Sequence, residues 1–197
     1  MSKGEDTRQR IVEIAAPLFN ERGFAGCSMA DVMEATGLEK GGIYRHFDSK
    51  EALAVEVLKY SVRQASIMRS TELSDIPSAI GKLRHVIGHF VERPSPVRGG
   101  CPLLNAAVDS DNGNSALRLL AKRAFADWRR SLAEVVEAGV RSGELKPDVQ
   151  ADEVADFIVA SLEGALVLSR LERGRAPLRR VQNMLELVLS SLRLCSL

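Results

Sequence analysis

The 197-residue sequence has few of the features that build disulfide frameworks or membrane spans. Its three cysteines, Cys27, Cys101 and Cys195, are far apart and odd in number, which fits a reducing compartment better than a disulfide framework. No apolar run approaches the roughly 20 residues that cross a membrane, and the polar start MSKGEDTRQR does not resemble a secretory signal. We therefore expect a cytoplasmic protein that does not bind membranes.

The chain also lacks an excess of charge of one sign. Its formal net charge is +1, so its total charge does not attract nucleic acid or anionic lipid. The first 60 residues contain eight Lys or Arg and ten Asp or Glu, so this segment is not basic either. Any binding to a polyanion must depend on a local group of cations.

The alternation of apolar and polar residues that marks β-strands is missing as well. Apolar residues instead recur at steps of three and four, and the composition favours helix. These patterns predict an all-α protein with about nine helices. The expected helices cover residues 7–22, 29–36, 39–47, 49–68, 78–93, 102–109, 115–142, 152–173 and 177–194.

The second and third predicted helices have the spacing of a helix-turn-helix unit. Gly37 in the turn permits a positive φ, while Val32, Leu38 and Ile43 are placed to pack the two helices together. In such a unit the second helix enters the major groove of DNA. Ile43 and Phe47 should point into the core, and the outward residues are Glu39, Lys40, Gly41, Gly42, Tyr44 and Arg45.

The residues around this turn resemble the DNA-binding domain of TetR-family transcriptional regulators. The resemblance covers about residues 7 to 55 and rests on LFNERGF, SMADV, ATGL, GGIYRHF and SKEAL. It implies an N-terminal three-helix, helix-turn-helix DNA-binding domain at residues 1–50. It also implies a helical-bundle domain at residues 51–197 that binds ligand and forms dimers.

The function implied by this resemblance is ligand-controlled transcription. A homodimeric repressor would bind double-stranded operator DNA of pseudo-palindromic sequence and release it when a small-molecule inducer binds. No cofactor or metal is expected. An enzyme or a carrier is the rival class, but the sequence shows no Ser/His/Asp, Cys/His, paired-carboxylate or phosphate-loop constellation.

Roles in DNA binding follow from the resemblance, position by position. Tyr44 and His46 are expected to hold the phosphate backbone, and Lys50 would add its charge at the start of the next helix. Ser28 and Thr7 are further candidates for phosphate contacts, through a hydroxyl or through amides at a helix N-terminus.

The recognition helix is expected to contact bases with its cations. Lys40 and Arg45 suit this role because cationic side chains pair with guanine acceptors. Gly41 and Gly42 would let the helix backbone lie close to the floor of the groove. The alternative is that the two glycines merely start a short helix.

The last two predicted helices are candidates for a dimer interface. Apolar or small residues surround the helix at residues 157–171, and the final helix carries two apolar stripes, which suggests burial against both the core and a partner. The alternative is a monomer with a thick core. The predicted interface residues are Phe157, Ser161, Leu162, Ala165, Leu168, Val181, Leu185, Val188 and Leu192.

A small-molecule site is expected among the central helices, as an apolar pocket with a few polar groups. Each candidate could instead be an ordinary core residue, and Glu163 an interface or surface residue. The candidate lining residues are Phe90, Cys101, Leu104, Asn105, Phe125, Trp128 and Glu163.

Cys101 supports an alternative input signal. It lies between Gly100 and Pro102 at a predicted helix start, where amide dipoles lower the pKa of a thiol. The protein would then be a thiol-based redox or electrophile sensor. The competing interpretation is a small buried residue that closes the loop onto the core.

His85 and His89 are four residues apart on one predicted helix, the spacing of a metal-binding pair. The apolar residues of that helix predict that both histidines face solvent. No third ligand is evident in the sequence. A metal site is therefore not predicted.

Overall fold

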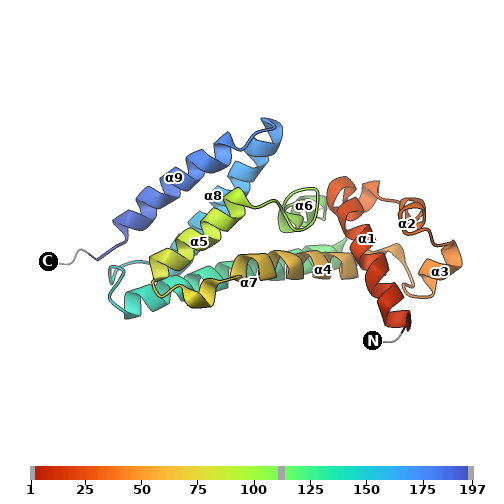
Figure 1. Ribbon diagram of the computed structural model, residues 1–197, viewed down its shortest axis with the longest axis horizontal. Helices are drawn as coiled ribbons and strands as arrows, with labels where there is room; N and C mark the ends of the chain where they lie inside the picture. The colour runs from red at the N-terminus through yellow and green to blue at the C-terminus, as the bar shows by residue number, and fades with distance from the viewer. Residues whose placement is uncertain (1–2, 111–113, 195–197) are drawn as a thin grey trace. The chain divides into compact units, whose positions relative to one another are not determined.

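The computed structural model describes residues 3–110 and 114–194 (Figure 1). In these two ranges the secondary structure consists of nine α-helices and one short 3-10 helix, which confirms the all-α prediction. No helix among them is long and apolar enough to cross a membrane. The helices are α1 (Lys3–Gly26), α2 (Met29–Thr36), α3 (Lys40–Tyr44), α4 (Lys50–Ser70), η1 (Leu73–Asp75), α5 (Ala79–Glu92), α6 (Pro102–Asp109), α7 (Ser115–Arg141), α8 (Ala151–Leu171) and α9 (Ala176–Ser191).

The chain forms two compact units. The first unit contains residues up to Ser66 together with Ser95–Ala124, and so includes α1 to α3, most of α4, α6 and the start of α7. The second unit contains Ile67–Pro94 and the chain from Phe125 onward. The functional boundary that the sequence places after residue 50 stays a prediction.

The four N-terminal helices share one apolar core. Ile11 and Ala15 of α1, Val32 of α2, Ile43 of α3 and Leu53 of α4 are all fully buried. Burial of one such aliphatic side chain stabilises a fold by about 1.5–3 kcal/mol. Ile43 therefore fixes α3 in the unit and leaves the opposite side of this short helix exposed.

Helix α2 begins and ends at local signals in the sequence. The hydroxyl of Ser28 accepts a hydrogen bond from the Asp31 amide at 3.1 Å, and the Asp31 carboxylate accepts one from the Ser28 amide at 2.7 Å. These reciprocal bonds form a capping box. Gly37 ends the helix with a φ of 67°, in the left-handed region that glycine adopts without strain.

The loop before α6 is held against α1 by two asparagines. The side-chain amide of Asn20 donates to the carbonyl oxygens of Arg98 at 2.9 Å and Gly100 at 3.1 Å. The amide of Asn105 donates to the carbonyl oxygens of Asn20 and Gly99, each at 2.9 Å. Gly99 has a φ of 111°, and a Cβ there would lie 2.9 Å from the Asn20 carbonyl carbon. The interruption RPSPVRGGCP is thus an ordered connection.

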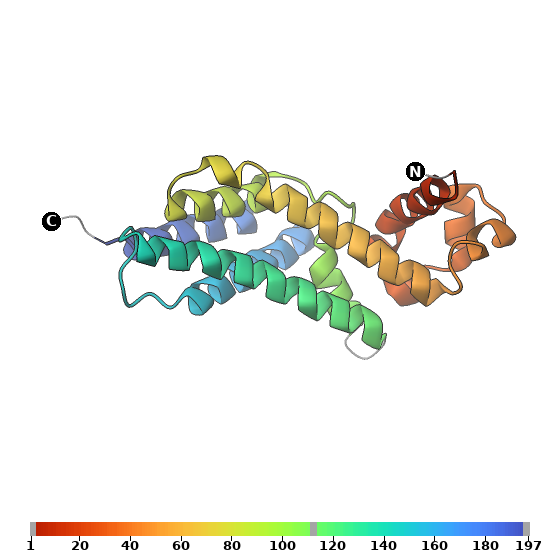
Figure 2. The ribbon, with the colours of Figure 1, turned by 90° about the horizontal axis from the view of Figure 1, so that it is seen from below.

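In the second unit, α5, α8 and α9 lie side by side (Figures 1 and 2). Their contact buries Leu83 of α5, Ile158 and Leu162 of α8, and Leu185 and Leu189 of α9. Each residue lies on the apolar stripe of its helix. Burial of these stripes explains why the three helices pack together.

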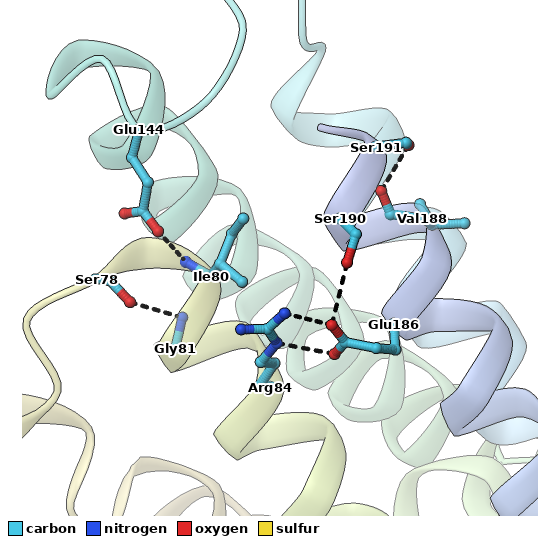
Figure 3. Close-up of polar contacts among 9 residues, drawn as sticks. All are labelled: Ser78, Ile80, Gly81, Arg84, Glu144, Glu186, Val188, Ser190 and Ser191. Carbon is cyan, nitrogen blue, oxygen red and sulfur yellow. Dashed lines mark hydrogen bonds and ion pairs between the residues drawn. The ribbon is translucent and has the colours of Figure 1, made fainter. Parts of the chain in front are cut away.

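Polar contacts fix α5 at two points (Figure 3). Glu144, which follows α7, accepts hydrogen bonds from the first amides of α5, those of Ala79 at 2.6 Å and Ile80 at 3.0 Å. One turn later, Arg84 forms a two-pronged ion pair with Glu186 of α9. The hydrogen bond from Arg84 lowers the pKa of Glu186 below its usual value. The position and rotation of α5 are therefore well defined.

Candidate nucleic-acid interface and effector site

Helix α3 is shorter than predicted. The sequence suggested a helix over residues 39–47, but α3 covers only Lys40–Tyr44 and is followed by a turn. Two of its five residues are glycines, the weakest helix formers after proline, which limits its length. The Phe47 amide donates to the Ile43 carbonyl at 3.1 Å, and both side chains are buried as predicted.

None of the ten residues predicted to contact DNA is buried in the core. Six are exposed, namely Ser28, Glu39, Lys40, Gly41, Tyr44 and Arg45. Four are half-buried, namely Thr7, Gly42, His46 and Lys50. Their roles toward DNA stay predictions, but all ten are placed where a ligand outside the chain can reach them.

Two of these residues have local roles in helices of the chain. Helix α1 begins at Lys3, so Thr7 is not an N-cap, and its amide belongs to the helix interior instead of the free N-terminal amides. The Ser28 hydroxyl donates to the Asp31 carboxylate at 2.5 Å while it caps α2. Its proton is therefore already used within the chain.

Several cations of the first unit are neutralised by carboxylates. Arg8 lies 3.3 Å from Glu56, and Lys59 lies 2.8 Å from the same carboxylate. Arg22 lies 2.5 Å from Asp31. The hydrogen bonds from Ser28 to this carboxyl group, with a smaller contribution from Arg22, lower the pKa of Asp31 to about 2. These cations balance acidic residues and add little positive potential.

The three cations predicted to meet DNA are arranged differently. Lys40, Arg45 and Lys50 form no ion pair with any residue in the described ranges. Lys40 lies over the ring of Tyr44 at 5.7 Å, and Lys50 over the ring of Phe24 at 4.4 Å. An aromatic ring orients a cation without neutralising it. A segment that is acidic in total thus keeps unpaired positive charges along α3 and the start of α4.

The glycines of α3 have no packing role that requires them. A Cβ at Gly41 would meet nothing within 4 Å, and a Cβ at Gly42 would be 3.5 Å from the Leu38 Cβ, an ordinary contact. Neither residue has a positive φ. Each costs about 1 kcal/mol of helix stability relative to alanine. The predicted close approach of these glycines to DNA is compatible with this geometry and stays a prediction.

We expect Gly41→Leu to change stability and DNA binding in opposite directions. The leucine projects into open space, so the free energy of unfolding should rise by about 0.5–1 kcal/mol. Operator affinity should fall at least tenfold because the side chain holds α3 away from the groove. Urea denaturation and electrophoretic mobility shifts measure the two effects. Unchanged affinity would leave the glycines with a local structural role only.

The predicted effector residues fall into two groups. Cys101, Leu104 and Asn105 belong to the first unit, where Asn105 helps to hold the loop before α6. Phe90, Phe125, Trp128 and Glu163 belong to the second unit. The prediction that all seven residues line one pocket thus stays untested, and Asn105 has a structural role that the sequence did not reveal.

An aromatic cluster lies in the second unit. The ring of Trp128 stacks on Phe90 at 5.9 Å and on Phe125 at 6.3 Å, and the guanidinium carbon of Arg69 lies 4.5 Å from its centroid. Trp128 is only 3% exposed, yet its indole nitrogen has no hydrogen-bond partner in the described ranges. A buried donor without an acceptor costs about 1–3 kcal/mol. Arg69 was missed because it belongs to the last turn of α4, outside any apolar repeat.

Some residues of the predicted dimer interface lie in the core of the chain, and the interface itself stays a prediction. Leu162, Ala165 and Leu185 are buried within the chain itself, so they contact its own core. The apolar repeat identifies buried stripes, but it does not distinguish an internal neighbour from a partner subunit. Ser161, Val181, Val188 and Leu192 are half-buried.

An exposed apolar surface remains on the last two helices. It comprises Phe157, Val167, Leu168 and Leu171 on α8 with Met184 and Leu187 on α9, and we call it the α8–α9 face. Leu168 is 51% exposed and Leu171 is 76% exposed. Gly164 lies among these α8 residues, and a Cβ there would meet nothing within 4 Å. Exposed apolar side chains grouped on neighbouring helices are typical of a protein interface.

The structure does not support the thiol-sensing alternative. Cys101 is only 6% exposed, whereas reactive thiols are accessible. Cys27 is fully buried, and this burial raises the pKa of its thiol. Cys195 lies outside the described residues. The two described thiols are thus in positions typical of structural cysteines.

Comparison with known proteins relates both parts of the chain to bacterial regulators. Residues 11–57 match the family model of bacterial regulatory proteins of the tetR family, and residues 79–185 match the tetracyclin repressor-like C-terminal domain. The HTH-type transcriptional repressor DhaR of Mycobacterium sp. (strain GP1) is 31% identical over 174 residues, which cover 87% of this chain and 86% of that protein.

Solved structures extend the similarity to nearly the whole chain. A TetR transcriptional regulator from Chloroflexus aurantiacus has 39% identity and a TM-score of 0.94, covering 99% of this chain and 100% of that one. A TetR-family regulator from Cytophaga hutchinsonii has 31% identity and a TM-score of 0.93, covering 100% of this chain and 99% of that one.

Proposed function

Since the chain belongs to the TetR family of bacterial transcriptional regulators, we propose that it represses transcription by binding a pseudo-palindromic operator as a homodimer. Regulators of this family bind operator DNA and typically act as homodimers. The observation that carries the proposal is the set of unpaired cations, Lys40, Arg45 and Lys50, at α3 and the start of α4. The cytoplasm, where the chromosome lies, is the proposed location.

The dimer forms through the α8–α9 face. Phe157, Ser161, Gly164, Leu168 and Leu171 recur at steps of three and four along α8, so they follow one stripe of the helix. A two-fold axis through this stripe would pair it with itself and exclude its apolar side chains from water. Gly164 permits two α8 helices to approach closely. Two recognition helices would then read successive major grooves, about 34 Å apart.

The inducer binds at the aromatic cluster of Phe90, Phe125 and Trp128. An aromatic or other flat apolar molecule could stack against such rings, and a hydrogen-bond acceptor on it would satisfy the Trp128 indole nitrogen. The guanidinium of Arg69 favours an electron-rich or anionic group. The proposed inducer is therefore an apolar ring compound that carries an acceptor oxygen.

The protein is in equilibrium between a DNA-binding state and a released state, and the inducer shifts this equilibrium toward release. An inducer changes the distribution only by its difference in affinity for the DNA-binding state and the released state. The inducer would bind one state more tightly if its acceptor reaches the buried indole nitrogen of Trp128 only in that state. The inducer thus acts without touching the DNA-binding residues.

Operator capture tests the proposed function. The purified protein should select a small number of DNA fragments from a genomic library, and footprinting should show two protected half-sites related by a two-fold axis. A reporter driven by the selected promoter should be silent when the protein is present and active when its gene is deleted. Binding with no preference among fragments, or activation of the reporter, would contradict repression.

The single tryptophan makes inducer binding directly measurable. A ring compound that stacks in the cluster should quench Trp128 fluorescence in proportion to occupancy. Trp128→Phe should keep the fold but weaken an acceptor-bearing inducer by about 5- to 15-fold, since it removes one hydrogen bond of about 1–1.5 kcal/mol. Isothermal calorimetry measures the loss. An analogue without the acceptor should bind the unsubstituted protein and Trp128→Phe with equal affinity. If Trp128→Phe weakens this analogue as much as the acceptor-bearing inducer, the assigned hydrogen bond is contradicted.

A further inference from the structure

Three metal-ligating side chains of the second unit converge beside the end of α4. Glu72 precedes η1, while His85 and His89 occupy successive turns of α5. One possible ligand atom from each residue lies within 4.8 Å of those of the other two. We propose that Glu72, His85 and His89 form a binding site for a divalent transition-metal ion such as Zn²⁺.

This arrangement corrects the expectation from the sequence. Both histidines were predicted to face solvent, yet both are half-buried, and their rings lie 3.8 Å apart. The third ligand was missed because Glu72 comes from the loop after α4 and has no periodic relation to α5. The loop brings it to the histidines only in the folded chain.

Each of the two histidines can keep one ring nitrogen available for a metal ion. Nε2 of His85 lies 2.8 Å from the Thr71 carbonyl oxygen, and Nδ1 of His89 lies 3.3 Å from the Met68 carbonyl oxygen. A carbonyl oxygen only accepts, so each of these nitrogens carries the proton. Nδ1 of His85 and Nε2 of His89 then keep their lone pairs. Metal-binding histidines usually donate their second ring nitrogen in this way, which fixes the ring.

Glu72 lies just past the C-terminus of α4 and has a left-handed backbone conformation. Its φ is 65°, in the left-handed region that non-glycine residues rarely adopt. Its exposed carboxylate makes no hydrogen bond or ion pair with any residue in the described ranges. A cation held with the two imidazoles would neutralise this carboxylate.

The donor set selects the class of ion. Two imidazole nitrogens and one carboxylate suit Zn²⁺, Co²⁺ or Ni²⁺, whereas Ca²⁺ and Mg²⁺ prefer oxygen ligands. Zinc bonds of about 2.1 Å in a tetrahedron place ligand atoms about 3.4 Å apart, which a rotation of the exposed Glu72 side chain can reach. Three protein ligands leave the fourth position to water or to another molecule.

The imidazoles are held in place without a metal. Glu144 caps the first amides of α5, and Arg84, next to His85, binds Glu186 of α9 (Figure 3). Only the Glu72 side chain must be ordered when the ion binds. A fixed pair of ligands lowers the entropic cost of binding, which favours a site of measurable affinity.

Titration of the metal-free, full-length protein with Co²⁺ tests the proposal. We expect one ion per chain, with the visible absorption of nitrogen and oxygen coordination and without the ultraviolet bands of cobalt–thiolate bonds. Zn²⁺ should displace the cobalt. At a free Zn²⁺ concentration one hundred times its dissociation constant, the melting temperature should rise by about 5–10 °C.

Conservative variants separate metal ligation from structure. His85→Gln retains a donor near Nε2 for the Thr71 carbonyl, and His89→Asn retains one near Nδ1 for the Met68 carbonyl. Each should keep the metal-free melting temperature within about 2 °C and weaken Co²⁺ binding at least a hundredfold, more than the loss of an outer-shell partner. Glu72→Gln should weaken Co²⁺ binding by at least tenfold. Glu92→Gln, at the exposed end of α5, is the matched control and should leave the affinity for Co²⁺ unchanged.

Several results would overturn the proposal. These are thiolate bands in the cobalt spectrum, affinity unaffected by the histidine variants, or no Co²⁺ binding at micromolar concentrations. The metal site goes beyond operator binding and does not depend on it, so its loss would leave the proposed repression intact. Conversely, normal metal binding in a protein that selects no operator would leave the site intact.

Discussion

Leu168→Arg should convert the proposed homodimer into a monomer and reduce operator affinity by about 10²- to 10⁴-fold. The side chain is 51% exposed in the single chain, so a charge there should change its stability by less than about 0.5 kcal/mol. In a two-fold interface, however, the same substitution introduces two arginines close to the axis. Their burial without carboxylate partners is strongly unfavourable.

Operator affinity falls because a monomer contacts only one of the two half-sites. A dimer holds its second recognition helix at a high effective concentration near the second half-site, which accounts for a gain of about 10²–10⁴ in affinity. A monomer keeps every contact of its own helix but loses this gain. Sedimentation equilibrium measures the mass, and mobility shifts measure operator affinity at protein concentrations above the dimer dissociation constant of the unsubstituted protein and below that of the variant.

Leu119→Arg provides the matched control. Leu119 is 48% exposed on α7 and does not belong to the α8–α9 face. Its substitution adds the same charge to a similarly exposed leucine and should leave both mass and operator affinity unchanged. If Leu119→Arg dissociates the protein while Leu168→Arg does not, the dimer uses another surface.

Local signals in the sequence predicted the helix-turn-helix well. Ser28, Asp31 and Gly37 define both ends of α2 through contacts within a few residues, so the sequence alone contains the necessary information. The inward positions of Ile43 and Phe47 follow equally from helical spacing. The length of α3 was overestimated because two glycines in five residues weaken a helix whose other side chains favour it.

Contacts between distant segments were much less predictable. The helical repeat showed that Leu162 and Leu185 belong to apolar stripes, but it did not show that the core of the same chain covers them. Asn105 looked like a pocket residue because nothing in the sequence indicates its contact with Asn20, 85 residues away. Glu72 joins His85 and His89 only through the path of a loop. Such arrangements depend on tertiary packing, which periodicity does not encode.

Removing one unpaired cation from α3 or the start of α4 should weaken operator binding far more than removing a cation that is paired with a carboxylate. Arg45→Ala should reduce affinity by about 30-fold to 10⁴-fold, because a base contact contributes about 1–3 kcal/mol and the dimer loses two of them. Arg22→Ala and Lys59→Ala are the controls, since each cation already lies beside a carboxylate. These controls should lose less than about threefold.

The salt dependence separates phosphate contacts from base contacts. Each phosphate neutralised by a cation contributes about 0.9 to the slope of log affinity against log salt concentration, so Lys50→Ala should reduce that slope by about 1.8 for the dimer. Its loss of affinity should be similar for all operator sequences. Arg45→Ala should instead relax the preference at one base pair in each half-site, because a base contact carries sequence information and a phosphate contact does not. Equal slopes and equal preferences in both variants would contradict the division of roles between α3 and the start of α4.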